Sequence, residues 1–201
     1  MNINKNRKKK MVRGTKDNKY LKGDILIAMP NMPDPRFAQT VIYVCAHNEE
    51  GAMGLVVNKP LGLPAYLSLL EQLEIDTANT EEGIEMLFGG PVEVDRGFVL
   101  HSDDYFQDTT IMVDKKIALT GTVDILRDIA AGNGPNNHLV VLGYSGWGPG
   151  QLDKEIKENG WLNVKADETI LFHSAPSEKW DKAMNKLGVD PLLLSEYAGN
   201  A

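Results

Sequence analysis

Two apolar segments, at residues 39–47 and 52–58, constrain the fold of this chain more than any other feature. Both are rich in β-branched residues and a polar turn at residues 48–51 joins them, so the pair predicts a β-hairpin. Alternation along the first segment gives two sets of side chains, Val41, Tyr43, Cys45 and His47 on one face and Ile42, Val44 and Ala46 on the other. Because both sets are largely apolar, we expect a strand that is covered on both faces.

Strand-like and helix-like segments interleave along the rest of the chain. Further strands are expected at residues 24–28, 85–88, 97–102, 109–113, 116–119, 138–143, 161–165 and 169–173. Helices are expected at residues 64–74, 122–131, 149–159 and 177–187. Interleaved elements together with hairpins predict an α/β (α+β) fold with a mixed sheet flanked by helices. A chain of 201 residues suits one such domain.

The charge of the chain is divided unevenly. Residues 1–22 hold nine Lys or Arg and one acid, whereas the remainder holds 12 basic and 27 acidic residues. The first segment is also poor in large apolar residues, so we expect a disordered basic tail at 1–22 and a single domain at 23–201. The acidic body disfavours nucleic-acid binding except through the tail, and a solubilising extension is the favoured interpretation of the tail.

The compartment is indicated by the cysteine count and by hydropathy. Cys45 is the lone cysteine of the sequence, which excludes an internal disulfide and fits a reducing compartment. No apolar run reaches the roughly 18 residues that cross a bilayer, and no secretory signal follows the basic stretch. We therefore expect a soluble cytoplasmic protein without a membrane partner.

The most distinctive segment is the glycine-rich run at residues 143–150, placed between an expected strand and an expected helix. Such a turn presents backbone N–H groups to an anion, yet the glycine spacing fits neither a phosphate-binding loop nor a dinucleotide fingerprint nor a nucleophile elbow. Two interpretations stay open: a tight turn packed under Trp147, or a site for an anion or small ligand. The candidate ligand-binding residues are Tyr144, Ser145, Gly146, Trp147, Gly148 and Gly150.

A second group of candidates contains the thiol and three histidines. Cys45 and His47 are expected on one strand face, but a partner from a neighbouring strand is needed to complete a site. His101 and His173 each precede a serine at an expected strand end, where they can meet Cys45 or Asp103 in space. No metal-binding motif supports a metal there, no cofactor is indicated, and buried hydrogen-bonded histidines are the alternative.

Arg96 is the remaining candidate. It follows a turn-rich segment at residues 89–91 and is suited to clamping a carboxylate or phosphate, or to forming a salt bridge within the acidic body. No catalytic residue can be assigned from the sequence.

Six motifs in order resemble the YqgE/AlgH family of uncharacterised bacterial proteins. They are GDILIAMPNMPD at 23–34, YVCAH at 43–47, GAMGLVVNKP at 51–60, GGPV at 89–92, RGFVLHS at 96–102 and LGYSGWGPGQL at 142–152. The resemblance covers about residues 21–187 and implies a compact domain around a mixed, partly barrel-like sheet. It also implies no established activity, although some members carry a label as regulators of transcription. Ser145 stands where the family pattern has alanine, and Lys59 where it commonly has arginine.

Three functions are compatible with these observations. The first is a binding or regulatory module that recognises a protein partner or a small anionic ligand through the turns at 30–35, 89–91 and 143–150. The second is an enzyme or redox protein that uses Cys45 with His47, His101 or His173. The third is a transcriptional regulator that contacts nucleic acid through its basic tail.

Overall fold

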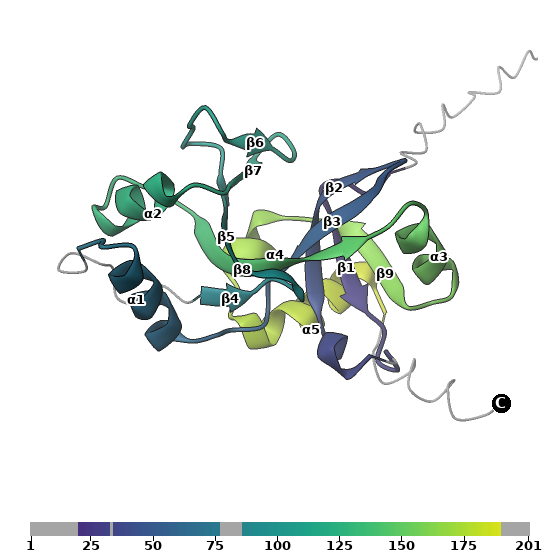
Figure 1. The fold of residues 1–201 in the computed structure, drawn as a ribbon. Coiled ribbons are helices and arrows are strands. Elements are labelled where there is room, and N and C mark those ends of the chain that lie inside the picture. The colour runs from purple at the N-terminus through teal and green to yellow at the C-terminus, as the bar shows by residue number, and fades with distance from the viewer. Residues whose placement is uncertain (1–19, 33, 77–85, 190–201) are drawn as a thin grey trace, which may run out of the picture.

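A curled sheet of nine strands forms the centre of this computed structural model, which describes residues 20–32, 34–76 and 86–189 (Figure 1). The strands are β1 (Asp24–Ala28), β2 (Val41–Asn48), β3 (Gly51–Val56), β4 (Met86–Phe88), β5 (Val92–Ser102), β6 (Ile111–Met112), β7 (Ile117–Thr120), β8 (His138–Trp147) and β9 (Trp161–Lys165). Their spatial order is β6-β7-β5-β8-β3-β2-β1-β9, with β4 against β8. The β4–β8 pair is parallel and the other pairs are antiparallel. The expected α+β fold with a mixed, partly barrel-like sheet is confirmed.

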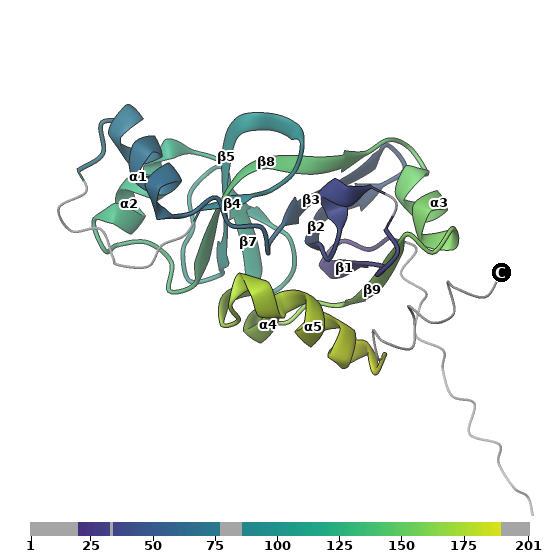
Figure 2. The same cartoon turned by 90° about the horizontal axis from the view of Figure 1, so that it is seen from below.

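Five α-helices of the described residues cover this sheet. They are α1 (Leu63–Gln72), α2 (Val123–Ala130), α3 (Gln151–Lys157), α4 (Glu168–Phe172) and α5 (Pro176–Leu187), and a short 3₁₀ helix spans Pro35–Phe37. Figure 2 shows α1 and α2 at one end of the molecule, α3 at the opposite end, and α4 with α5 along one side. No helix in the described part of the chain is long and apolar enough to span a bilayer.

The core has three apolar clusters that follow this arrangement. The largest joins α4 and α5 to one face of the sheet, including Tyr43, Leu100 and Val141. A second packs α1 and α2 on the opposite face of β5 and β8. The third packs α3 and the loop after β1 on the opposite face of β1 and β2. The first five residues of β2 are buried, so the prediction of a strand covered on both faces is confirmed.

A β-bulge in β2 changes which side chains share a face. Val44 pairs with Gly54 of β3 whereas Ala46 pairs with Met53, so Cys45 is the extra residue. Alternation restarts after the bulge, and His47 then lies opposite Ala52, which packs with the α3 cluster. Cys45 packs in the cluster of α4 and α5. The prediction that Cys45 and His47 share a face is therefore wrong.

The glycine-rich run is mostly strand rather than turn. β8 continues to Trp147, beyond the predicted end at residue 143, and pairs with β3 there. Gly143 has φ +70°, and a Cβ on it would lie 2.5 Å from the carbonyl oxygen of Gly90. A Cβ on Gly90 would in turn lie 2.2 Å from the carbonyl carbon of Tyr144. Because these glycines allow two backbone segments to approach closely, their presence in the sequence is explained without a bound ligand.

The predicted strand at residues 169–173 is also wrong, because α4 occupies it. The side chain of Asp167 accepts a hydrogen bond from the Ile170 amide at 2.9 Å and caps the helix. Glu168 adds a negative charge in the first turn. Capping and packing outweigh the strand preference of the β-branched residues in this short segment.

Candidate functional site

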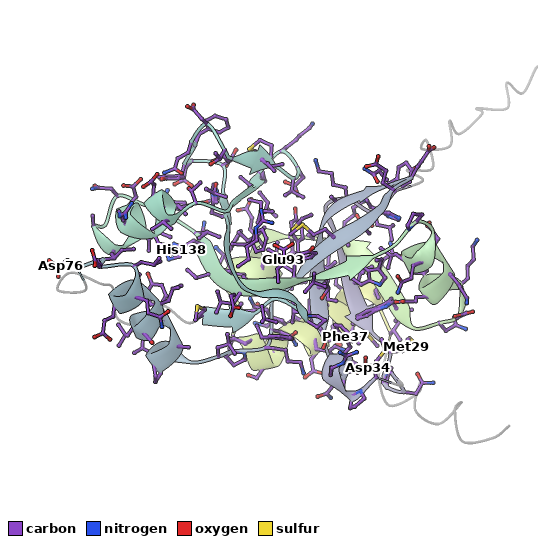
Figure 3. The ribbon with its side chains drawn as sticks, viewed as in Figure 1. Met29, Asp34, Phe37, Asp76, Glu93 and His138 are labelled. Carbon is purple, nitrogen blue, oxygen red and sulfur yellow. The ribbon has the colours of Figure 1, made fainter. Side chains whose placement is uncertain are left out.

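A cavity of about 480 Å³ lies where the loop after β1, the end of β8 and α3 meet. Its walls include Met32, Asp34, Arg36 and Phe37 of the loop, Pro91 between β4 and β5, Ser145, Gly146 and Trp147 of β8, Gln151, Glu155 and Glu158 at α3, and Trp161 of β9. Figure 3 shows Asp34 and Phe37 together at this end of the molecule, far from His138 at the other. The volume falls in the range of small-molecule sites.

Three aromatic rings give the cavity a stiff apolar wall. Trp147 and Trp161 meet edge to face with centroids 6.2 Å apart, and Phe37 meets Trp161 at 5.7 Å. The two tryptophans are only 7% and 3% exposed, so the core holds their orientation.

Glu155 of α3 organises the polar side of the same wall. One carboxylate oxygen, Oε2, accepts hydrogen bonds from the indole N–H groups of Trp147 at 2.9 Å and Trp161 at 2.8 Å. The other, Oε1, accepts from the Gln151 side-chain amide at 2.8 Å. Gln151 also accepts the Gly148 N–H at 3.0 Å, so one donor of the supposed anion-binding turn is already occupied.

The charges on the lining are mainly negative. Among the described residues around the cavity, Arg36 is the one cationic side chain, and Asp34, Glu155 and Glu158 are acidic. Arg36 Nη2 lies 2.6 Å from Asp34 Oδ2, and its hydrogen bonds lower the pKa of the Asp34 carboxyl. This lining does not favour a small anion, one of the ligands that the sequence left open.

The candidates of the glycine-rich run divide between two places. Ser145, Gly146 and Trp147 line the cavity, and Gly148 and Gly150 lie in the adjoining turn before α3. Tyr144 and Arg96 line a second groove of about 620 Å³, to which Gly146 and Trp147 also contribute.

Arg96 has partners within the protein. Arg96 Nη1 lies 2.9 Å from Glu93 Oε2, and the guanidinium lies 5.0 Å from the ring centroid of Phe98. The structure therefore shows the salt bridge that was the alternative to a ligand clamp.

Cys45 lies in surroundings that disfavour a nucleophile. Its side chain is 4% exposed and its thiol lies 3.7 Å from the Tyr43 carbonyl oxygen. Burial raises the pKa of the thiol to about 12, whereas reactive thiols have a lowered pKa.

The histidines occupy separate environments. His47 accepts the Leu21 amide hydrogen at Nδ1, and its Nε2 lies 3.7 Å from Asp153. His101 is fully buried, with Nδ1 2.8 Å from the Ser102 carbonyl oxygen and Nε2 2.9 Å from the Thr120 hydroxyl, and burial lowers its pKa. His173 is exposed at the C-terminus of α4, so its predicted place at a strand end is wrong. The described residues contain no group of three or more His, Cys, Asp or Glu suited to a metal ion.

The predicted tail lies largely outside the described residues. Of residues 1–22 only 20–22 are described, and Leu21 packs against the α3 cluster. A role of the tail in nucleic-acid binding stays a prediction, as does the cytoplasmic compartment inferred from the single cysteine.

Sequence reasoning missed several residues of the cavity, among them Phe37, Glu155 and Trp161. Glu155 and Trp161 resemble ordinary residues of a helix and a strand. A sequence signal for Glu155 is its spacing from Gln151: the two residues are one helical turn apart, on the face of α3 that meets the tryptophans.

Fold and cavity together define a single-domain α+β protein with a half-barrel sheet and an aromatic-walled cavity at one end. Residues 25–192 match the model of a family described as AlgH-like (DUF179). The chain is 51% identical over 190 residues to a UPF0301 protein of Rhodopseudomonas palustris strain HaA2, covering 90% of this chain and 87% of that protein. It is also 51% identical over 182 residues to a UPF0301 protein of Rhodospirillum rubrum, covering 90% and 95%. The chain belongs to the AlgH-like family, as its motifs predicted.

Two solved structures resemble the chain in fold. The solution structure of the AlgH protein from Pseudomonas aeruginosa has a TM-score of 0.75 at 44% identity and covers 90% of this chain and 96% of that one. A crystal structure of a protein from Corynebacterium diphtheriae has a TM-score of 0.69 at 17% identity, covering 87% and 91%, and this likeness concerns the fold alone.

Proposed function

We propose that this chain is a binding module that receives a small molecule, or a side chain of a protein partner, in the cavity between the loop after β1, β8 and α3. The observation that carries the proposal is the convergence of separate motif segments on one hollow. Residues 28–34, 89–92 and 142–152 are distant in sequence, yet each contributes to the lining.

The surroundings of the cavity also support recognition rather than simple packing. Its aromatic wall is rigid, because Glu155 fixes both indole rings by hydrogen bonds. A concave site with apolar walls and a few oriented polar groups is the usual form of a ligand site. The surroundings of Cys45 do not support the alternative of an enzyme or redox protein that uses this thiol.

The test is an NMR titration of the full chain with a panel of cationic, neutral and anionic fragments, following the indole N–H signals of Trp147 and Trp161. We expect some fragments to shift these signals in a saturable way. Replacing the wall residue, Phe37→Ala, should weaken binding by about tenfold. The matched control is Phe106→Ala, because Phe106 is 67% exposed and lies outside the cavity lining.

Two results would contradict the proposal. One is a panel in which no fragment moves either indole signal. The other is equal weakening of binding by Phe37→Ala and Phe106→Ala, since the cavity wall would then have no special part in recognition.

A further inference from the structure

We propose that the cavity is selective for an organic cation, an ammonium or guanidinium group held against the tryptophans beside Glu155. This inference rests on the proposed function, because it names the chemical class of the ligand in the same cavity. Among the described residues, no cation pairs with the carboxylate of Glu155.

Glu155 is held by hydrogen bonds from neutral donors. The two indole N–H groups and the Gln151 amide fix its position without neutralising it, and no Lys, Arg or His of the described residues forms an ion pair with it. A partly buried carboxylate is stabilised by an opposite charge. An arriving cation would supply that charge.

Two nearby cations among the described residues have other partners. Arg36 is bound by Asp34 at 2.6 Å, and Lys154 lies 3.7 Å from Glu158 one helical turn further along α3. The described part of the lining holds three carboxylates and one guanidinium, a balance that disfavours an anion and favours a cation.

The aromatic wall favours the same ligand class. Trp147 and Trp161 both line the cavity, and tryptophan is the strongest of the aromatic side chains in binding cations. Because Glu155 accepts from both indole N–H edges, it orients the two rings and adds negative charge beside them. Rings and carboxylate thus line the same cavity.

The experiment compares two probes that differ in charge but hardly in shape. Choline and its neutral isostere 3,3-dimethylbutan-1-ol are titrated into the full chain, followed by tryptophan fluorescence and by the indole N–H signals. We expect choline to bind at least about tenfold more tightly than the isostere. Agmatine, titrated in parallel, shows whether a guanidinium is preferred to a quaternary ammonium.

Two variants test the part of Glu155. Glu155→Gln should reduce the preference for choline over the isostere by about tenfold, because it removes the charge and keeps the shape. Glu71→Gln removes an exposed carboxylate on α1, outside the cavity lining, and should leave the preference unchanged. If Glu155→Gln does not fold, the comparison of choline with its isostere on the unaltered chain still decides the question.

The outcomes separate this inference from the proposed function. Equal affinity for choline and the isostere, or binding of neutral or anionic fragments alone, overturns the cation inference and leaves a binding module. A preference for choline that persists in Glu155→Gln overturns the role of the carboxylate. No indole shift with any compound overturns both proposals.

Discussion

Lys179 of α5 is a buried charge whose removal is expected to stabilise the protein. Its side chain is 1% exposed, and its ammonium donates a hydrogen bond to the Leu171 carbonyl oxygen at 2.6 Å. Burial lowers the pKa of Lys179 from an ordinary 10.5 to about 8. At neutral pH Lys179 is protonated in both states, but its protonation is more favourable in the unfolded chain than in the folded protein.

The size of the effect follows from that difference in pKa. A shift of this size corresponds to a cost of about 3 kcal/mol below pH 8, where both states are protonated. Lys179→Met removes this cost and leaves the Leu171 carbonyl oxygen without its ammonium partner, which costs about 1 kcal/mol. We expect the variant to be about 2 kcal/mol more stable at pH 7.

The sign of the effect should change with pH. Between pH 8 and 10.5 the folded state releases its proton while the unfolded state retains it, so the stability of the unaltered chain rises toward that of the variant. Above pH 10.5 only the lost hydrogen bond remains, and the variant should be about 1 kcal/mol less stable.

Urea unfolding followed by tryptophan fluorescence at pH 7, 9 and 10.5 measures this change. Lys182→Met is the control on the same helix, because Lys182 is 43% exposed at its side chain and pairs with Glu178. It should change stability by less than about 1 kcal/mol at each pH. A Lys179→Met protein that is less stable than the unaltered chain at pH 7, or a difference that does not vary with pH, would refute the reasoning.

Three further predictions concern buried groups and backbone contacts. At pH 8, Cys45 of the folded protein should react with iodoacetamide on the order of a thousandfold more slowly than Cys45 of the protein unfolded in urea. Equal rates would show that the folded protein has an accessible thiolate. Because burial lowers the pKa of His101, the unfolded state binds more protons, and the stability of the protein should fall as pH decreases below about 6.5. In urea unfolding at pH 5–7, His101→Gln should reduce this dependence of stability on pH. A variant with the same pH dependence as the unaltered chain would contradict this role of His101. Gly90→Ala should lower the free energy of unfolding by at least about 3 kcal/mol, because the new Cβ would meet the backbone of Tyr144. Gly132→Ala, where a Cβ would have nothing within 4 Å, should lower it by about 1 kcal/mol. Similar losses for the two variants in urea unfolding would show that the close contact at Gly90 does not matter for stability.

Much of the fold can be predicted because the signals are local. The hairpin of β2 and β3 follows from β-branched residues around a polar turn, and the helix α1 follows from apolar residues at helical spacing. The strand predicted at residues 169–173 failed because one capping aspartate decides a segment with few residues. Whether glycines form a turn or let strands approach depends on the partner backbone, so the extent of β8 was not visible in the sequence.

The candidate site was predictable only in part, for a related reason. The motifs indicated which segments are candidates for binding, and three of these segments meet at the cavity. The prediction that Cys45 and His47 share a strand face is wrong because a one-residue bulge reverses the alternation of side chains. Glu155 gains its importance from two tryptophans that lie eight residues before it and six residues after it, and only the folded chain brings their N–H groups to one oxygen.

The length of β8 has a consequence for how the molecule comes apart. Among the described strands, β8 alone joins the β6-β7-β5 side of the sheet to the β3-β2-β1-β9 side. Neither half can detach without breaking the hydrogen bonds of this one strand, so both should melt in a single cooperative step. Its amide protons should exchange with solvent last, and a ligand that clamps its final residues would slow exchange in the distant half as well.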